Sequence, residues 1–136
     1  MPLVTKDGFS KTPDTVFVAL DESDGNAEAL DLPNDADLEA IAPKVKNAQI
    51  IRIPFPSFAD GRGFSVARRL RDLGYSGHLR AHGHIINEQF RYALECGFDD
   101  LEISDEQAAR QPEAHWSAEP ALNYREKLAR REGARD

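Results

Sequence analysis

Residues 48–73, AQIIRIPFPSFADGRGFSVARRLRDL, contain one complete strand–turn–helix unit. The apolar, β-branched run over 48–55 predicts a buried strand, with Pro54 at its exit. After a turn with two glycines, apolar side chains recur at helical spacing, at Phe64, Ala67, Leu70 and Leu73. Gly74 predicts the end of that helix. A buried strand followed directly by an amphipathic helix is half of a parallel βαβ unit.

The same alternation continues along the chain. Further strands are predicted over 15–20, 78–82 and 98–103. Three further helices are predicted from their capping and stop residues. The first is capped by Asp35 or Asp37 and has Leu38, Ile41, Ala42 and Val45 on one face, and Pro43 should kink or shorten it. The second runs from Asn87 to Gly97, and the third begins at a Ser104–Gln107 capping box. Short connections predict right-handed βαβ units and a mainly parallel sheet, which is either open and Rossmann-like or half-barrel-like.

The length of 136 residues predicts a single small α/β domain. Residues 21–34 lack periodicity and are acidic, so we expect a mobile surface loop there. Residues 112–136 are expected to form a C-terminal extension with an exposed, charged helix over about 123–131.

Composition excludes several classes of protein. A net charge of −7 disfavours a nucleic-acid-binding protein. There is no apolar run long enough for a membrane span and no apolar segment of a secretory signal at Met1–Asp7. The single Cys96 excludes an internal disulfide and an all-cysteine metal site. We therefore expect a cytoplasmic protein that does not contact membranes.

The turn between the first strand and its helix is the strongest candidate for a ligand site. Charge reverses over residues 60–91, which hold six arginines and three acidic residues. In α/β sheets, ligands bind at the carboxyl ends of the strands, and the first turn of a helix attracts anions. The candidate anion-binding residues here are Asp60, Gly61, Arg62, Gly63 and Ser65. The alternative is a purely structural turn, in which Asp60 caps the helix and pairs with Arg62.

A second polar stretch is His78-Leu79-Arg80-Ala81-His82-Gly83-His84. Strand alternation places His78, Arg80 and His82 on one face. A zinc or iron site is disfavoured because Arg80 would repel the cation, so no metal is expected. Arg80 instead could converge with Arg62 on one anion.

Residues 55–103 resemble a bacterial family, the domain of unknown function numbered 934. The resemblance rests on three blocks and on Gln89, the blocks being FPxFxDGRGFSxARxLR over 55–71, GYxGxLRAxG over 74–83, and CGFD over 96–99. This sequence departs from the family at His78 and His84, where an acidic residue is more usual. Since these histidines are not typical of the family, a metal site is further disfavoured.

The resemblance implies a role beside assimilatory sulfate reduction, since members are labelled as probable oxidoreductases in sulfite reduction. It supports an oxyanion site, with Arg80 and Gln89 added to the turn. The expected ligand is a small oxyanion or an adenylyl-sulfate-type molecule, and the expected partners are sulfite reductase, phosphoadenylyl-sulfate reductase or a second copy of the chain.

Two functions are the main candidates, and a purely structural or oligomeric role is a third. One is an accessory or regulatory protein of sulfite reduction. The other is an oxidoreductase component, with Asp60 as the candidate general base. Because the sequence has no flavin, haem, iron–sulfur or nicotinamide motif, that enzyme would need an unidentified cofactor or partner.

Overall fold

The computed structural model describes residues 2–116. The helix expected over 123–131 lies outside this part of the chain. No helix within residues 2–116 is long and apolar enough to cross a bilayer.

One mixed sheet organises residues 2–116, with the strand order β2-β1-β7-β6-β5-β4-β3. Five neighbouring strands are parallel and follow one another in chain order: β3 (Val18–Ala19), β4 (Ala29–Asp31), β5 (Ile50–Phe55), β6 (His78–Gly83) and β7 (Asp100–Glu102). The order of these parallel strands in the sheet never reverses, as expected for the half-barrel-like of the two predicted arrangements. A Rossmann-like sheet would reverse its strand order and place a ligand crevice there.

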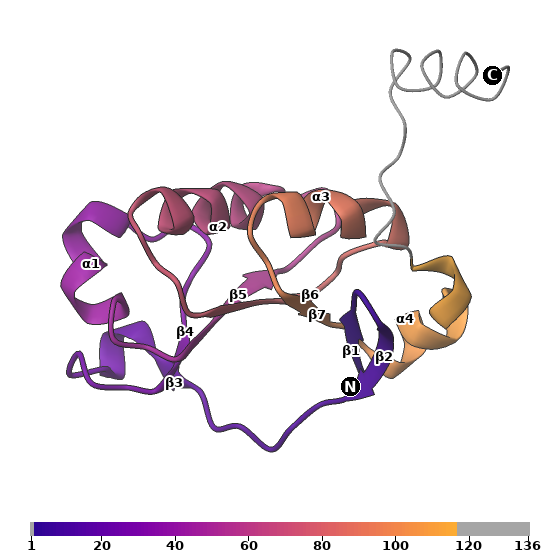
Figure 1. Cartoon of the computed structure of the whole chain (residues 1–136), viewed down its shortest axis with the longest axis horizontal. Coiled ribbons are helices and arrows are strands. Elements are labelled where there is room, and N and C mark those ends of the chain that lie inside the picture. The colour runs from indigo at the N-terminus through magenta and orange to yellow at the C-terminus, as the bar shows by residue number, and fades with distance from the viewer. Residues whose placement is uncertain (1, 117–136) are drawn as a thin grey trace, which may run out of the picture.

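Helices connect these strands and pack on one face of the sheet. They are α1 (Leu38–Val45), α2 (Arg62–Asp72) and α3 (Phe90–Glu95). A fourth helix, α4 (Asp105–Arg110), follows the last strand and lies at the end of the sheet beside β1 and β2 (Figure 1). Figure 1 shows α2 and α3 side by side above the sheet, while the segment between β2 and β3 crosses below it. The sheet therefore has a helix-covered face and an open face.

Alternation along the strands builds the core beneath the helices. In β5, Ile51, Ile53 and Phe55 are buried, and Leu79, Ala81 and Leu101 continue this surface on β6 and β7. The Phe55 ring packs against Phe64 of α2, with ring centroids 4.8 Å apart. The residues between them in sequence, such as Arg52 and Arg80, consequently point to the open face.

The predicted α/β fold is confirmed, but the N-terminal third differs in detail. Residues 29–31, expected within the mobile loop over 21–34, form β4, in which Ala29 and Leu30 are buried. This strand is stabilised by its parallel pairing with β5, which a local sequence pattern does not reveal. The strand expected over 15–20 is only Val18–Ala19, because Leu20–Glu22 turns into a 3-10 helix.

A β-hairpin at the N-terminus extends the sheet. Strands β1 (Pro2–Thr5) and β2 (Gly8–Lys11) are antiparallel, and β1 pairs antiparallel with β7. Gly8, directly after the short turn between the two strands, adopts a φ of +114°, a conformation that favours glycine. The antiparallel pairs make the sheet mixed rather than wholly parallel.

Candidate ligand site on the open face of the sheet

The turn before α2 brings Asp60 and Arg62 together. Asp60 accepts three hydrogen bonds from Arg62: from the backbone N–H at 3.2 Å, from Nε at 3.0 Å and from Nη2 at 2.8 Å. Asn34 donates a further hydrogen bond to Asp60 at 3.2 Å. The carboxylate of Asp60 thus occupies the position at the helix N-terminus that a bound anion would take.

Three other residues of the predicted site, Gly63, Gln89 and Arg80, have structural contacts. A Cβ on Gly63 would lie 2.5 Å from the Phe55 ring, so glycine allows α2 to approach β5. Ser65 is exposed. Gln89 donates to the carbonyl of Phe58 at 2.9 Å and accepts from the Ile86 N–H at 3.1 Å, which ties two loops together. Arg80 lies on the open face with Asp100 rather than with Arg62.

This pairing gives a prediction for the Asp60 carboxyl group. Hydrogen bonds from Arg62 lower its pKa from 3.8 to about 2. Since the pKa is depressed, the pairing stabilises the fold above about pH 4 and is lost as pH falls toward 2. Replacing Arg62 with alanine should return the Asp60 pKa toward its usual value, which NMR titration of the carboxyl carbon measures. An ordinary pKa in the wild-type protein would instead mean that Arg62 is free to bind an anion.

A row of four charged residues crosses the open face of the sheet. Asp31, Arg52, Arg80 and Asp100 occupy the same register position on β4, β5, β6 and β7. Each outer carboxylate binds the arginine beside it through two hydrogen bonds, Asp31 with Arg52 at 2.7 and 2.9 Å and Asp100 with Arg80 at 2.9 and 3.2 Å. The two guanidinium groups are therefore on neighbouring strands.

Two residues of this row, Asp31 and Arg52, line a cavity, and Arg52 makes the most contacts around it. Its Nη1 also donates to Glu102 at 3.0 Å, and its guanidinium lies 4.0 Å from the centre of the Phe17 ring. Hydrogen bonding to Asp31 raises its pKa, so it stays cationic. Arg52 lay outside our predicted site. The alternation of Arg52 with the apolar Ile51 and Ile53 could have indicated that its side chain lies on the face of the sheet opposite to theirs.

The cavity lies at the carboxyl ends of β4, β5 and β6, with a volume of about 590 Å³. Its wall is mostly apolar, with a few polar groups: Ala19, Leu20, Asp21, Asp31, Leu32, Pro33, Arg52, Pro54 and His82. A volume of roughly 300–1,000 Å³ with few polar groups is typical of small-molecule sites. This cavity is thus the candidate ligand site.

The histidines of the polar strand separate into different surroundings. His82 lines the cavity, where burial and the nearby Arg52 lower its pKa, so it is neutral at pH 7. His78 lies 2.9 Å from Asp100, and His84 lines a different pocket beside Phe58. Burial alone would raise the pKa of Asp100, but hydrogen bonds from His78 and Arg80 lower it. Within residues 2–116, no three His, Cys, Asp or Glu side chains are grouped to hold a metal ion.

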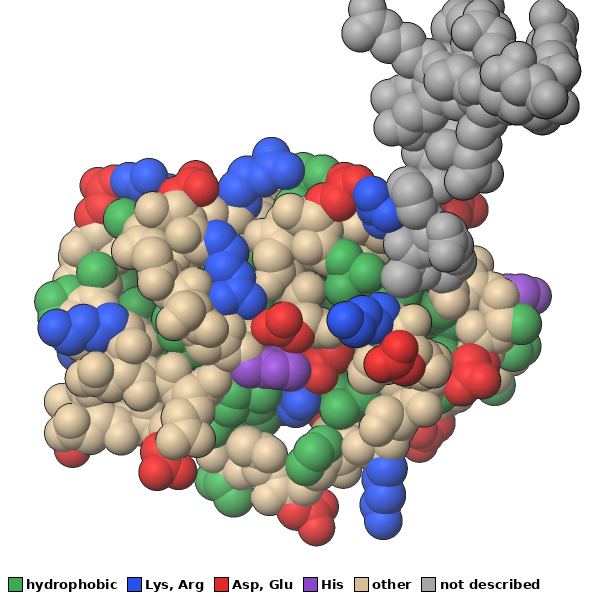
Figure 2. Space-filling view, in the orientation of Figure 1, with side chains coloured by type: hydrophobic (Ala, Val, Ile, Leu, Met, Phe, Trp, Pro, Cys, Tyr) green, Lys and Arg blue, Asp and Glu red, His purple; other side chains and the backbone are tan. Residues whose placement is uncertain are grey.

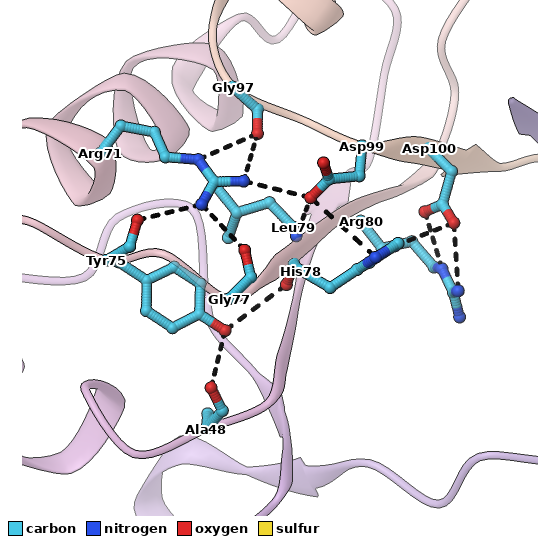
Figure 3. Close-up of polar contacts among 10 residues, drawn as sticks. All are labelled: Ala48, Arg71, Tyr75, Gly77, His78, Leu79, Arg80, Gly97, Asp99 and Asp100. Carbon is cyan, nitrogen blue, oxygen red and sulfur yellow. Dashed lines mark hydrogen bonds and ion pairs between the residues drawn. The ribbon is translucent and has the colours of Figure 1, made fainter. Parts of the chain in front are cut away.

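At the opposite edge of the sheet, Arg71 fastens the end of α2 to the starts of β6 and β7 (Figure 3). Its guanidinium donates five hydrogen bonds of 2.7–3.1 Å, to the carbonyls of Tyr75, Gly77 and Gly97 and to the carboxylate of Asp99. A guanidinium has five N–H groups, so every donor is used. The role of Arg71 is structural.

Comparison with known proteins identifies the family of the chain. The family model "Bacterial protein of unknown function (DUF934)" matches residues 29–133. The chain belongs to this family. No curated protein and no solved structure matches it.

The blocks by which the sequence resembles DUF934 largely coincide with structural contacts. Arg71, Gly97 and Asp99 form the network just described. Gly63 and Gly83 are close to Phe55. Arg80 is different, because its buried guanidinium has a nitrogen, Nη1, without a hydrogen-bond partner in the described chain.

Proposed function

We propose that this DUF934 protein is an accessory protein of sulfite reduction that binds a nucleotide-sized sulfur or phosphorus oxyanion ligand in the open-face cavity. The observation that carries the proposal is the 590 Å³ cavity at the carboxyl ends of the parallel strands, with Arg52 in its wall. Parallel α/β sheets bind their ligands at this edge.

Cavity size favours one of the two ligand types expected from the sequence. A bare sulfite or sulfate ion is far smaller than the cavity and has no apolar part to contact Leu20, Leu32 and Pro33. An adenylyl sulfate offers a flat base for the apolar wall, hydroxyl groups for Asp31, and an anionic group for Arg52. We therefore favour the adenylyl-sulfate type over the free ion.

An accessory role fits the described residues better than catalysis. Asp60 was the candidate general base, but a carboxylate with a pKa of about 2 that is bound to Arg62 is a poor proton acceptor near neutral pH. His82, neutral and inside the cavity, has no carboxylate hydrogen-bonded to it within residues 2–116. Binding, without a catalytic set, is what this arrangement supports.

Calorimetric titration of the full chain tests the proposal. Adenosine 5′-phosphosulfate should bind saturably and at least about tenfold more tightly than sulfite, sulfate or phosphate, because only the larger ligand contacts the apolar wall. Immobilised protein should also retain purified sulfite reductase. If no ligand binds and the reductase is not retained, the proposal is wrong.

A further inference from the structure

Two arginines in adjacent register positions are an unusual feature of the open face. Arg52 and Arg80 are direct neighbours on β5 and β6. Like charges opposite one another on neighbouring strands repel. Asp31 and Asp100 bind the outer sides of the pair, and Glu102 reaches from β7 to accept a hydrogen bond from Nη1 of Arg52.

Donors remain unused on both arginines. The side chain of Arg80 is 5% exposed, and its Nη1 has no hydrogen-bond partner within the described residues. Toward residues 2–116, Arg52 uses three of its five N–H groups, two with Asp31 and one with Glu102. Leaving a buried charged donor unsatisfied is costly, so an acceptor is expected beside it.

We propose that an anionic oxygen-bearing group, free or part of a larger ligand, binds between Arg80 and Arg52 and accepts hydrogen bonds from Nη1 of Arg80 and from the unused N–H groups of Arg52. This inference deepens the proposed function and rests on it, since Arg52 also lines the cavity. Oxyanions suit the position because their several oxygens accept from two planar guanidinium groups at once.

The route to this position runs beneath the segment between β2 and β3. Figure 2 shows an opening between the sheet and this segment, with a basic side chain at its edge. Residues 13–16 of the segment are exposed, and Phe17 covers Arg52. Nη1 of Arg80 itself is out of contact with solvent, beside the exposed end of the pair that Arg52 forms.

The charged groups around Arg52 and Arg80 determine how substitutions should change the affinity for an anion. Asp31, Asp100 and Glu102 balance Arg52 and Arg80 with one negative charge to spare, so directed hydrogen bonds rather than net charge hold the anion. An incoming anion competes with Glu102 for Nη1 of Arg52. Glu102→Gln should therefore strengthen anion binding, whereas Arg80→Lys should weaken it, because lysine keeps the charge near Asp100 but has no second nitrogen.

The test uses selenate, an oxyanion whose position is visible by anomalous diffraction. Crystals of the full chain soaked in selenate should show a peak within hydrogen-bond distance of Nη1 of Arg80. In solution, Arg80→Lys should weaken selenate binding about tenfold or more, and Glu102→Gln should strengthen it several-fold. Arg69→Lys, on the surface of α2, is the matched control and should change nothing.

Each outcome has a definite meaning. A water molecule at Nη1 without an anomalous peak, or affinities unchanged in both variants, would overturn the inference. If Arg80→Lys does not fold, Glu102→Gln and the wild-type map decide. Adenosine 5′-phosphosulfate that binds equally well to Arg80→Lys would contradict the arginine pair but leave the proposed function standing. Selenate bound at the pair, with no binding of the larger ligand, would support the pair and contradict the proposed function.

Discussion

Replacing Gly83 with alanine is expected to destabilise the protein by about 3 kcal/mol. Gly83 ends β6 with a φ of +118°, a conformation that side chains rarely adopt. An added Cβ would lie 2.5 Å from the carbonyl oxygen of Phe55 on the neighbouring strand. Relieving that overlap would separate β5 from β6 at the edge where the cavity lies. Urea denaturation followed by circular dichroism measures the change.

Gly74→Ala is the matched control for this substitution. Gly74 also has a positive φ, +96°, but an added Cβ would meet no atom within 4 Å. Gly74→Ala should lower the free energy of unfolding by only about 1 kcal/mol, because backbone strain is its sole effect. Equal losses in the free energy of unfolding for the two substitutions would mean that the close approach of Gly83 to Phe55 does not affect stability.

Arg71→Met is expected to lower the free energy of unfolding by about 3 kcal/mol. The substitution keeps an unbranched, apolar stem but leaves the carbonyls of Tyr75, Gly77 and Gly97 without their shared donor. The half-exposed Arg69, two residues earlier, pairs only with the exposed Glu39 among the described residues, so Arg69→Met should cost under about 1 kcal/mol. Urea denaturation of both variants checks this. A loss at Arg71 no larger than at Arg69 would contradict the structural role.

These two substitutions bear on how DUF934 membership is interpreted. Gly83 and Arg71 both belong to the blocks that carry the resemblance, and both act through contacts that build the sheet edges. A block of matching residues is therefore no guide by itself to the ligand site. Arg80 stands apart in these blocks because packing does not satisfy its guanidinium.

Local sequence patterns were sufficient for the central part of the fold. The β5–α2–β6 unit was predicted almost to its ends because its strands are apolar runs and its helix is amphipathic and ends at Gly74. α1 begins as predicted, with Asp37 accepting from the Ala40 N–H. The short strands β3 and β4 were harder to predict, because pairing with other strands stabilises them more than their own sequence does.

The site that we propose on the open face was harder to find from the sequence than the fold. The turn at Asp60–Ser65 has the residue types of an anion site, but Asp60 itself takes the place of the anion. Arg52 lies in an apolar strand and looked like part of its hydrophobic run. Its importance depends on Asp31, Glu102 and Phe17, which come from three other segments, and only the folded chain brings them together.

We propose that ligand binds on the open face and not at the Asp60–Ser65 turn. Calorimetric titration of adenosine 5′-phosphosulfate into Ala19→Leu and Arg62→Ala tests it most directly. Ala19 lines the cavity, so a leucine there should fill part of it and weaken binding about tenfold or more, while Arg62→Ala should bind like the wild type. Binding lost in Arg62→Ala and retained in Ala19→Leu would contradict the account.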